Sequence, residues 1–320
     1  MSTIVSKFQN DPQFTPPLAA SEEIDLRELF SAVWEGKWLI IVITVVFIVG
    51  SVIFALMQPN IYKSEALLAP AAEDQSGGLS ALASQFGGLA SLAGVNLGAK
   101  GSNDKTLLAI EVLKSRQFAS EFIAKHNILP DLMAAKKWDR EQDKVVYNED
   151  YYLSESDTWV RKVKSPYVSK PSMQEAFKKF SKILVVNKQK ETGMVTITVE
   201  HLSPSVAKNW VTWLVQDINK FMKERDVAEA NRSSEFLNKQ IALTNVADIK
   251  TILYKLIEEQ AKTIMFAEVR EEYVFKTIDP ALIPEERSRP KRALIVVIGT
   301  FIGGVLAIML VLIRYFSRKI

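Results

Sequence analysis

Four basic side chains gather just before the last long apolar run of the sequence and are its best candidates for binding. They are Arg287, Arg289, Lys291 and Arg292. Basic residues beside a membrane are attracted to anionic lipid headgroups, with a free energy of about 1 kcal/mol for each residue. The simplest interpretation of this basic group is therefore contact with the headgroup layer of a membrane.

The residue types that support catalysis do not form a constellation in the sequence. The chain has no cysteine, which excludes disulfides, thiolate metal sites and cysteine nucleophiles. His126 and His201 have no neighbouring ligands in the sequence, which favours surface or structural positions for both. The glutamate pairs at 258–259, 271–272 and 285–286 fit solvated helix and loop surfaces better than an acid–base pair. We therefore predict no catalytic residue, no metal site and no enzyme activity.

Nucleotides and nucleic acids are disfavoured as ligands by motif and by charge. The stretch Gly94–Ser102 resembles a phosphate-binding loop but lacks the adjacent Gly-Lys-Ser/Thr of that motif, which excludes nucleotide binding. No Asp-x-Asp that could hold the metal of a sugar transferase occurs. The 40 basic and 37 acidic residues are interspersed and give a net charge of +3, which does not suggest nucleic-acid binding. No cofactor is expected.

Two uncharged apolar runs predict membrane spans at Trp38–Met57 and Ala293–Ile313. About 20 apolar residues are needed to cross the hydrocarbon core of a bilayer as a helix. Trp34 and Trp38 flank the first run and Tyr315 the second, as aromatic residues do at membrane interfaces. The prediction divides the chain into the segments 1–37, 38–57, 58–292, 293–313 and 314–320.

The orientation of the spans is predicted from the basic residues near their ends. Arg27 and Lys37 precede the first span and Lys63 follows it, which favours a cytoplasmic N-terminus. The second span has the opposite bias, but the first usually dominates and a long loop crosses regardless of its charge. We therefore expect cytoplasmic termini and an external loop over 58–292. Ahead of the first span, Asp25–Trp34 predicts a short amphipathic juxtamembrane helix.

Gly299 and Gly303 form a G-x-x-x-G pattern inside the second span. Because glycine has no side chain, this spacing allows another helix to pack closely. The partner could be the first span, a second protomer or another membrane protein. Glycine is common in membrane helices, so the spacing alone does not choose between packing and chance.

Short elements flank a long helical stretch in the external loop. Runs of apolar and β-branched residues predict strands at 61–68, 182–187, 194–200 and 273–278. Helix patterns cover Thr106–His126 and Ser172–Phe180. The aromatic residues of 138–172 favour a small packed irregular region over a sugar-binding surface. The Gly-, Ala- and Leu-rich repeat over 77–96 predicts a mobile segment or short helices.

The stretch Ser205–Asp279 contains neither glycine nor proline. Two runs of apolar residues at helical spacing are separated by 243–248, where Thr, Asn and Asp compete with the backbone for hydrogen bonds. Ser203 before Pro204 is an N-cap followed by proline at the first helical position. We predict two long helices, the first over 205–243. Because both ends of the loop reach one membrane, the helices form a hairpin that projects from a membrane-proximal α/β base.

This arrangement resembles the Wzz chain-length determinants, also called polysaccharide co-polymerases. The most specific part is Arg270–Phe275, followed by a segment similar to the family's proline-rich segment, with Pro280, Pro284 and Pro290 ahead of the second span. The junction around Val195–Leu214 is similar to the family's strand-to-helix junction. Ser203 stands where members often have Asp, but both residues are good helix caps.

The resemblance implies an α+β inner-membrane protein, with two transmembrane helices flanking a periplasmic α/β base that carries a long projecting helical hairpin. It implies a ring-like homo-oligomer that sets the modal length of a lipid-linked polysaccharide made by a Wzy-type polymerase, typically lipopolysaccharide O-antigen. The basic group would then contact the pyrophosphate of the lipid carrier or the polymerase. The alternatives are a co-polymerase for capsule or exopolysaccharide that works with a separate cytoplasmic tyrosine kinase, and a two-span periplasmic sensor.

Overall fold

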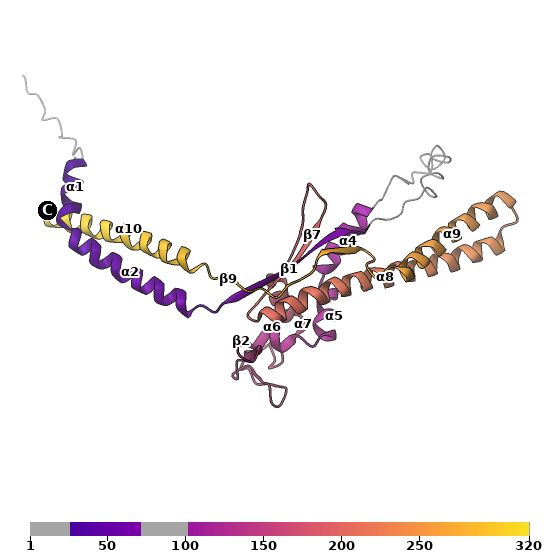
Figure 1. The fold of residues 1–320 in the computed structure, drawn as a ribbon, viewed down its shortest axis with the longest axis horizontal. Coiled ribbons are helices and arrows are strands. Elements are labelled where there is room, and N and C mark those ends of the chain that lie inside the picture. Colours follow the sequence, from indigo (N-terminus) through magenta and orange to yellow (C-terminus); the bar gives the residue numbers. More distant parts are fainter. Residues whose placement is uncertain (1–25, 72–101, 320) are drawn as a thin grey trace, which may run out of the picture. The chain divides into compact units, whose positions relative to one another are not determined.

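A computed structural model describes residues 26–71 and 102–319 of the chain (Figure 1). The chain forms two compact units, one made of the segments up to Gln58 and from Lys291 onward, the other of Pro59–Pro290. The repeat predicted at 77–96 lies outside the described residues, as does nearly all of the stretch that resembles a phosphate-binding loop.

The first unit contains α1 (Leu26–Glu35), α2 (Lys37–Met57) and α10 (Arg292–Lys319). α2 and α10 pack side by side (Figure 1). Both are long and apolar enough to cross a membrane, and only 6% and 17% of their most apolar windows are buried within the protein. Apolar side chains that face outward on nearly all sides are typical of helices surrounded by hydrocarbon.

The second unit is built on one antiparallel sheet with the strand order β6-β7-β1-β8, and β9 pairs with the other end of β1. The strands are β1 (Ile61–Pro70), β6 (Leu184–Lys188), β7 (Val195–His201), β8 (Phe275–Asp279) and β9 (Arg287–Arg289). The four predicted strand regions are confirmed, whereas β9 was not predicted. β1 is central, and its neighbours come from segments far apart in the sequence.

The main core forms where the helices of the second unit meet the sheet. These helices are α4 (Ser102–Leu113), α5 (Arg116–Lys125), α6 (Leu129–Ala134), α7 (Met173–Ile183) and the first half of α8 (Pro204–Leu243). Side chains from α5, α7 and α8 meet there, with Phe122, Phe180 and Trp210 almost completely buried. Val195, Ile197 and Val199 supply the sheet face, because alternate residues of a strand point to the same side.

α8 and α9 (Ala247–Val269) form the predicted hairpin (Figure 1). The Ser203 hydroxyl accepts a hydrogen bond from the Val206 N–H and Pro204 is the first helical residue, so the predicted N-cap is confirmed. At about 1.5 Å per residue, the 40 residues of α8 extend roughly 60 Å. Thr244 ends α8 inside the predicted turn.

The prediction of one helix over Thr106–His126 was wrong, because the chain breaks at Lys114 between α4 and α5. The Ser115 hydroxyl accepts a hydrogen bond from the Phe118 N–H at 3.2 Å and starts a new helix. Serine favours this capping geometry over a helix interior. The apolar spacing continues across the break and hides it. α7 likewise runs on to Ile183, so β6 begins later than expected.

Four short strands fill the aromatic-rich region: β2 (Ala135–Asp139), β3 (Lys144–Tyr147), β4 (Tyr152–Leu153) and β5 (Thr158–Trp159). The ring centroids of Tyr147 and Tyr152 lie 5.3 Å apart, and those of Tyr152 and Trp159 5.0 Å apart. The two tyrosine hydroxyls donate to Asp131 and Asp157. A hydrogen bond to Asp157, together with burial, raises the pKa of Tyr152 to about 12. These contacts confirm the packing interpretation.

Candidate functional site

The basic group is divided between the two units. Arg287 and Arg289 belong to β9, where Arg289 pairs with Ile61 of β1 and its Nε lies 3.3 Å from the Glu200 carboxylate. Lys291 and Arg292 begin the second segment of the first unit. The Arg292 Nε–H donates to the Ala55 carbonyl at the end of α2. Two of the four basic residues therefore belong to each unit.

The proline-rich segment between β8 and β9 is held against the central strand. Pro280 follows the end of β8, and the next residue, Ala281, is buried. The Ser64 hydroxyl donates to the Leu282 carbonyl at 2.7 Å, which fixes the segment to β1. Pro284 and Pro290 are partly buried. The proline-rich segment therefore joins two strands, β8 and β9, that pair with opposite ends of β1.

Asn219 fastens the end of the hairpin to the sheet and was missed by the sequence analysis. Its Oδ1 accepts hydrogen bonds from the Val274 and Phe275 N–H groups at 2.8 and 2.9 Å. Its Nδ2 donates to the Phe275 carbonyl and to the Val215 carbonyl one turn earlier. The side chain is only 5% exposed. The Asn219 amide therefore satisfies backbone N–H and C=O groups at the start of β8, as a neighbouring strand would do.

The signal for Asn219 was present in the sequence. It follows Ile218 directly and lies between Val215 and Met222 in the apolar face of α8. A polar residue at a core position of a helix must find partners, because an unpaired buried amide is costly. The partners themselves lie 55 and 56 residues further along the chain, so the sequence does not identify them.

His201 links the strand-to-helix junction to α6. Its Nδ1 accepts a hydrogen bond from the Ser203 N–H at 3.0 Å, and its Nε2 lies 3.2 Å from the Asp131 carbonyl oxygen. A carbonyl only accepts, so Nε2 carries the proton and the ring is neutral. Burial lowers the pKa of His201 below its ordinary value. The predicted structural role of this histidine is confirmed by these contacts.

His126 is also a structural residue. Its ring stacks on Trp213 of α8 with centroids 4.5 Å apart, and its Nε2 lies 2.7 Å from the Asp217 carboxylate. Lys125 forms an ion pair with the same carboxylate. These contacts join the end of α5 to α8. In the part of the chain that the structure describes, no group of three His, Cys, Asp or Glu side chains could hold a metal ion.

The far half of the hairpin exposes large apolar side chains. Burial along α8 is concentrated between Ala207 and Met222 and then falls away. Beyond that point Phe236 is 60% exposed and Leu243 78% exposed. On α9, Tyr254, Met265 and Val269 are exposed as well, so both helices present apolar surface that the hairpin itself does not cover.

Gly299 and Gly303 face the first span. A Cβ added to Gly299 would lie 2.6 Å from the Ser51 Cβ, and one added to Gly303 would lie 2.5 Å from the Phe47 Cβ. Both distances are shorter than real Cβ contacts, so a side chain at either position would force α2 and α10 apart. The G-x-x-x-G pattern of α10 therefore packs against α2, the helix that corresponds to the first predicted span.

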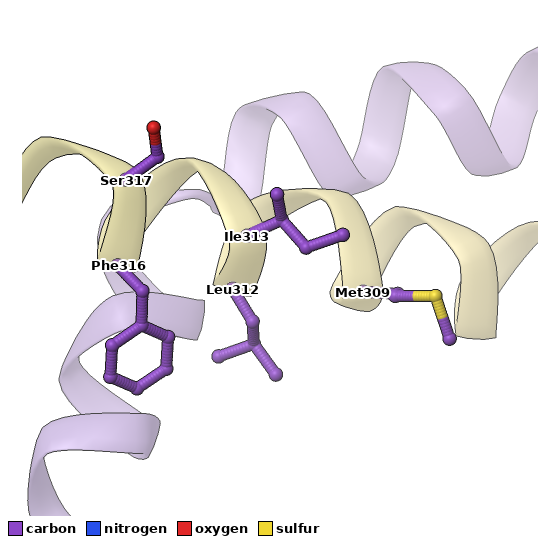
Figure 2. A pocket seen from close by; sticks show the side chains of 5 residues that line it. All are labelled: Met309, Leu312, Ile313, Phe316 and Ser317. Atoms are coloured by element: carbon purple, nitrogen blue, oxygen red, sulfur yellow. The ribbon is translucent and has the colours of Figure 1, made fainter.

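The C-terminal end of α10 borders a pocket of about 510 Å³ (Figure 2). Met309, Leu312, Ile313, Phe316 and Ser317 line it. Four of these side chains are apolar and the fifth offers one hydroxyl. The pocket therefore carries no acid, base or nucleophile pair, and we assign it no chemistry.

Comparison with known proteins gives two family matches. Residues 22–126 match the family model "Wzz: Chain length determinant protein", and residues 238–316 match "GNVR: G-rich domain on putative tyrosine kinase". The first match confirms the resemblance predicted from the sequence. No curated protein matches the chain.

The solved structures that are similar to this chain include two polysaccharide co-polymerases. One, described as "full-length bacterial polysaccharide co-polymerase", has 13% identity and a TM-score of 0.38, covering 92% of this chain and 99% of that one. The other is a fragment of WzzB, a polysaccharide co-polymerase from Salmonella Typhimurium, with 12% identity and a TM-score of 0.23. That match covers 72% of this chain and 100% of the fragment.

Proposed function

We propose that this chain, a Wzz-type polysaccharide co-polymerase, sets the length to which a bacterial surface polysaccharide is polymerised. The observation that carries the proposal is the pair of family matches, which lie at the two ends of the chain and each include one apolar helix. We take the polymer to be lipopolysaccharide O-antigen. The chain acts beside a Wzy-type polymerase and its lipid-linked product, as a regulator of the polymerase.

The membrane arrangement follows from chain connectivity. The second unit leaves and rejoins the first at its two ends, after Gln58 and before Lys291. With α2 and α10 crossing the inner membrane, Pro59–Pro290 lies on one side and both termini on the other. We place the second unit in the periplasm and the termini in the cytoplasm, as the basic residues before the first span favour.

The proposed mechanism is that of a scaffold. The α8–α9 hairpin exposes apolar side chains along its far half, and a second copy of the chain can cover them. Repetition of this contact around a ring would build a wall of hairpins beside the polymerase. The geometry of that wall would bias the length at which polymerisation stops, without any chemistry in the wall itself.

The basic group supplies a separate contact in this proposal. Arg287 and Lys291 are exposed and face either the polymerase or the pyrophosphate of the lipid carrier. Replacing all four basic residues by Gln would then alter the modal length at unchanged protein level. An unchanged length distribution would leave them with headgroup attraction alone.

The first experiment is deletion of the gene in its host, with the surface polysaccharides resolved on a gel. We expect loss of a modal length cluster while polymer of scattered lengths is still made. Wild-type complementation restores the cluster, and immunoblots confirm equal expression. A surface glycan that is unchanged in every class would refute chain-length regulation and would favour a two-span sensor.

A second candidate function has support from the GNVR match, whose description refers to putative tyrosine kinases. In this alternative the polymer is capsule or exopolysaccharide, and a separate cytoplasmic tyrosine kinase works with the chain. The same deletion separates the two candidates. An unchanged O-antigen ladder together with altered capsule or exopolysaccharide would favour the second.

A further inference from the structure

The loop between β5 and α7, residues 160–172, is held in a fixed shape by one arginine, and we call it the clamped loop. The Arg161 Nη2–H donates to the Val168 carbonyl at 2.9 Å, and the Nε–H donates to the Ser169 carbonyl at 2.7 Å. The same guanidinium group forms two hydrogen bonds of 2.8 Å with the Glu175 carboxylate in the first turn of α7. Because a bidentate pair of this kind is strong and geometrically specific, Arg161 holds the two ends of the loop side by side.

This arrangement gathers three lysines on one small surface. Lys162 and Lys170 are each adjacent to a residue that the Arg161 hydrogen bonds join, so both lie where the two ends of the loop meet. Toward the tip, the Tyr167 N–H donates to the Lys164 carbonyl at 3.1 Å and closes a turn. All residues from 162 to 170 are exposed. A fixed loop loses little conformational entropy when a ligand binds, so these lysines are partly preorganised for binding.

The positive charge of the three lysines is not balanced within the clamped loop. From 158 to 174 the sequence contains Arg161 and the three lysines but no acidic residue. Glu175 balances Arg161. Within residues 26–71 and 102–319, the three lysine side chains form no ion pair and no hydrogen bond. An anionic ligand can therefore bind them without displacing an ion pair seen in the structure.

The tip of the clamped loop adds an aromatic ring to this charge. Tyr167 is 57% exposed and its neighbour Val168 is 63% exposed. Tyr147 and Tyr152 pack against each other, whereas Tyr167 makes no ring contact within the described residues. A tyrosine offers an apolar ring face and a polar hydroxyl. That combination suits a sugar, which has apolar C–H faces and a rim of hydroxyl groups.

We propose that the clamped loop binds an acidic polysaccharide, with carboxylate or phosphate groups of the polymer at the three lysines and one sugar ring against Tyr167. The inference rests on the proposed function, because it names the chemical class of the polymer whose length is set. An anionic membrane is a poorer fit, because binding to a bilayer surface scales with the apolar area that is buried and the tip offers little.

The experiment measures the binding of polygalacturonate, an acidic polysaccharide, to the full-length protein in nanodiscs of phosphatidylcholine. Dextran of similar length serves as the neutral polysaccharide, and polyglutamate supplies the charge without the sugar. We expect polygalacturonate to bind several-fold more tightly than either polymer. Hydrogen exchange at residues 162–170 should slow when polygalacturonate is bound.

Two triple variants with the same loss of charge test the lysines. Replacing Lys162, Lys164 and Lys170 by Gln should weaken the binding of polygalacturonate about tenfold, because three exposed ion contacts are lost. The control replaces three lysines that are also exposed but lie outside the clamped loop, namely Lys182, Lys190 and Lys255. The control should bind nearly as the wild type does.

Variants of the tip and of the clamp test the other two parts of the site. Tyr167→Ala should weaken binding several-fold, whereas Tyr167→Phe keeps the ring and should bind nearly as the wild type does. Arg161→Gln keeps all three lysines but releases the loop, so it should speed hydrogen exchange at Val168 and Ser169 and weaken binding. Thermal unfolding of each variant confirms that it is folded.

Several results would overturn the proposal. Equal binding by the two triple variants would remove the lysines as the site. Equal binding of polygalacturonate and polyglutamate would make the loop a general polyanion surface, and equal binding of dextran would remove the requirement for charge. Slow hydrogen exchange at residues 162–170 in phosphatidylglycerol nanodiscs without polymer would assign the loop to the membrane. Because the assay contains no polymerase, its failure would refute this site alone, and the gene deletion would still test chain-length regulation.

Discussion

The hydrogen bonds of Asn219 allow a quantitative prediction. Replacing Asn219 by Ala leaves the Val274 and Phe275 N–H groups and the Phe275 carbonyl without this partner, in a site where the side chain is 5% exposed. Each buried polar group left unsatisfied costs about 1–3 kcal/mol. A water that enters the space left by the amide, and the better helix propensity of Ala, recover part of this. We expect a net loss of about 3 kcal/mol in the free energy of unfolding.

The assay is thermal unfolding of the full-length protein in detergent, followed by the fluorescence of tryptophans such as Trp210, which is buried in the same core. For a folded unit of this size, roughly 2–4 °C of midpoint shift corresponds to 1 kcal/mol. The second unit should therefore melt about 6–12 °C lower in the Asn219→Ala variant. Hydrogen exchange should also become much faster at the Val274 and Phe275 amides.

A control on the same helix separates this effect from a change in helix propensity. Asn231 is exposed on α8, and Asn231→Ala should change the free energy of unfolding by no more than about 0.5 kcal/mol. Asn219→Asp keeps the acceptor but loses both donors and buries a charge, so it should cost as much as Asn219→Ala or more. A loss below about 1 kcal/mol for Asn219→Ala, with unchanged exchange at Val274 and Phe275, would refute the reasoning.

Three other predictions follow from buried contacts. Burial lowers the pKa of His201 in the folded protein, so the unfolded chain binds this proton at a higher pH than the folded protein does. The contribution of neutral His201 to stability is therefore complete above about pH 6.5 and falls as the pH decreases below that value. His201→Asn should reduce the difference between melting temperatures at pH 7.5 and 5.5; an unchanged difference would exclude His201 as its source. The Arg161 guanidinium lowers the pKa of Glu175 from 4.5 to about 2, so this carboxylate stabilises the fold above pH 4.5 and less as the pH falls toward 2. Glu175→Gln should cost about 1–2 kcal/mol at pH 7 in denaturant unfolding and flatten the acid dependence; equal stability at pH 7 would contradict this. Gly303→Leu should lower the melting temperature of the membrane-spanning unit in detergent, because its side chain collides with α2, whereas Gly304→Leu should not; equal melting would contradict the packing.

The sequence predicted those features whose cause is local. The two long apolar helices follow from uncharged runs, and the start of α8 follows from Ser203 and Pro204, which act on the turn they begin. The strands were found from their composition, since β-branched and apolar residues favour a half-buried sheet. The break at Ser115 was not predicted, because the sequence there gives two conflicting signals. Serine favours the start of a new helix, whereas the helical spacing of apolar residues continues through it.

Features made by distant partners could not be read from the sequence. β9 has only three residues, Arg-Ser-Arg, and becomes a strand because β1 offers its backbone groups to Arg287 and Arg289. The composition of the basic group predicted attraction to phosphates. Which unit each of its residues belongs to depends on the fold and could not be predicted from composition. The contacts of Asn219 likewise require knowing that β8 lies beside α8.

The distribution of burial separates a part of the second unit that has its own core from a part whose apolar side chains are uncovered. The sheet, α5, α7 and the first half of α8 share one core, in which Trp210, Leu214 and Ile218 are almost fully buried. Beyond Met222, the hairpin is stabilised by contact between two helices that leave Phe236 and Val269 exposed. Helices gain most of their stability from a packed apolar face, so a long hairpin with uncovered apolar side chains gains stability when another surface covers them. The same side chains that would weaken an isolated protomer are thus the ones that favour assembly, which is the property a scaffold requires.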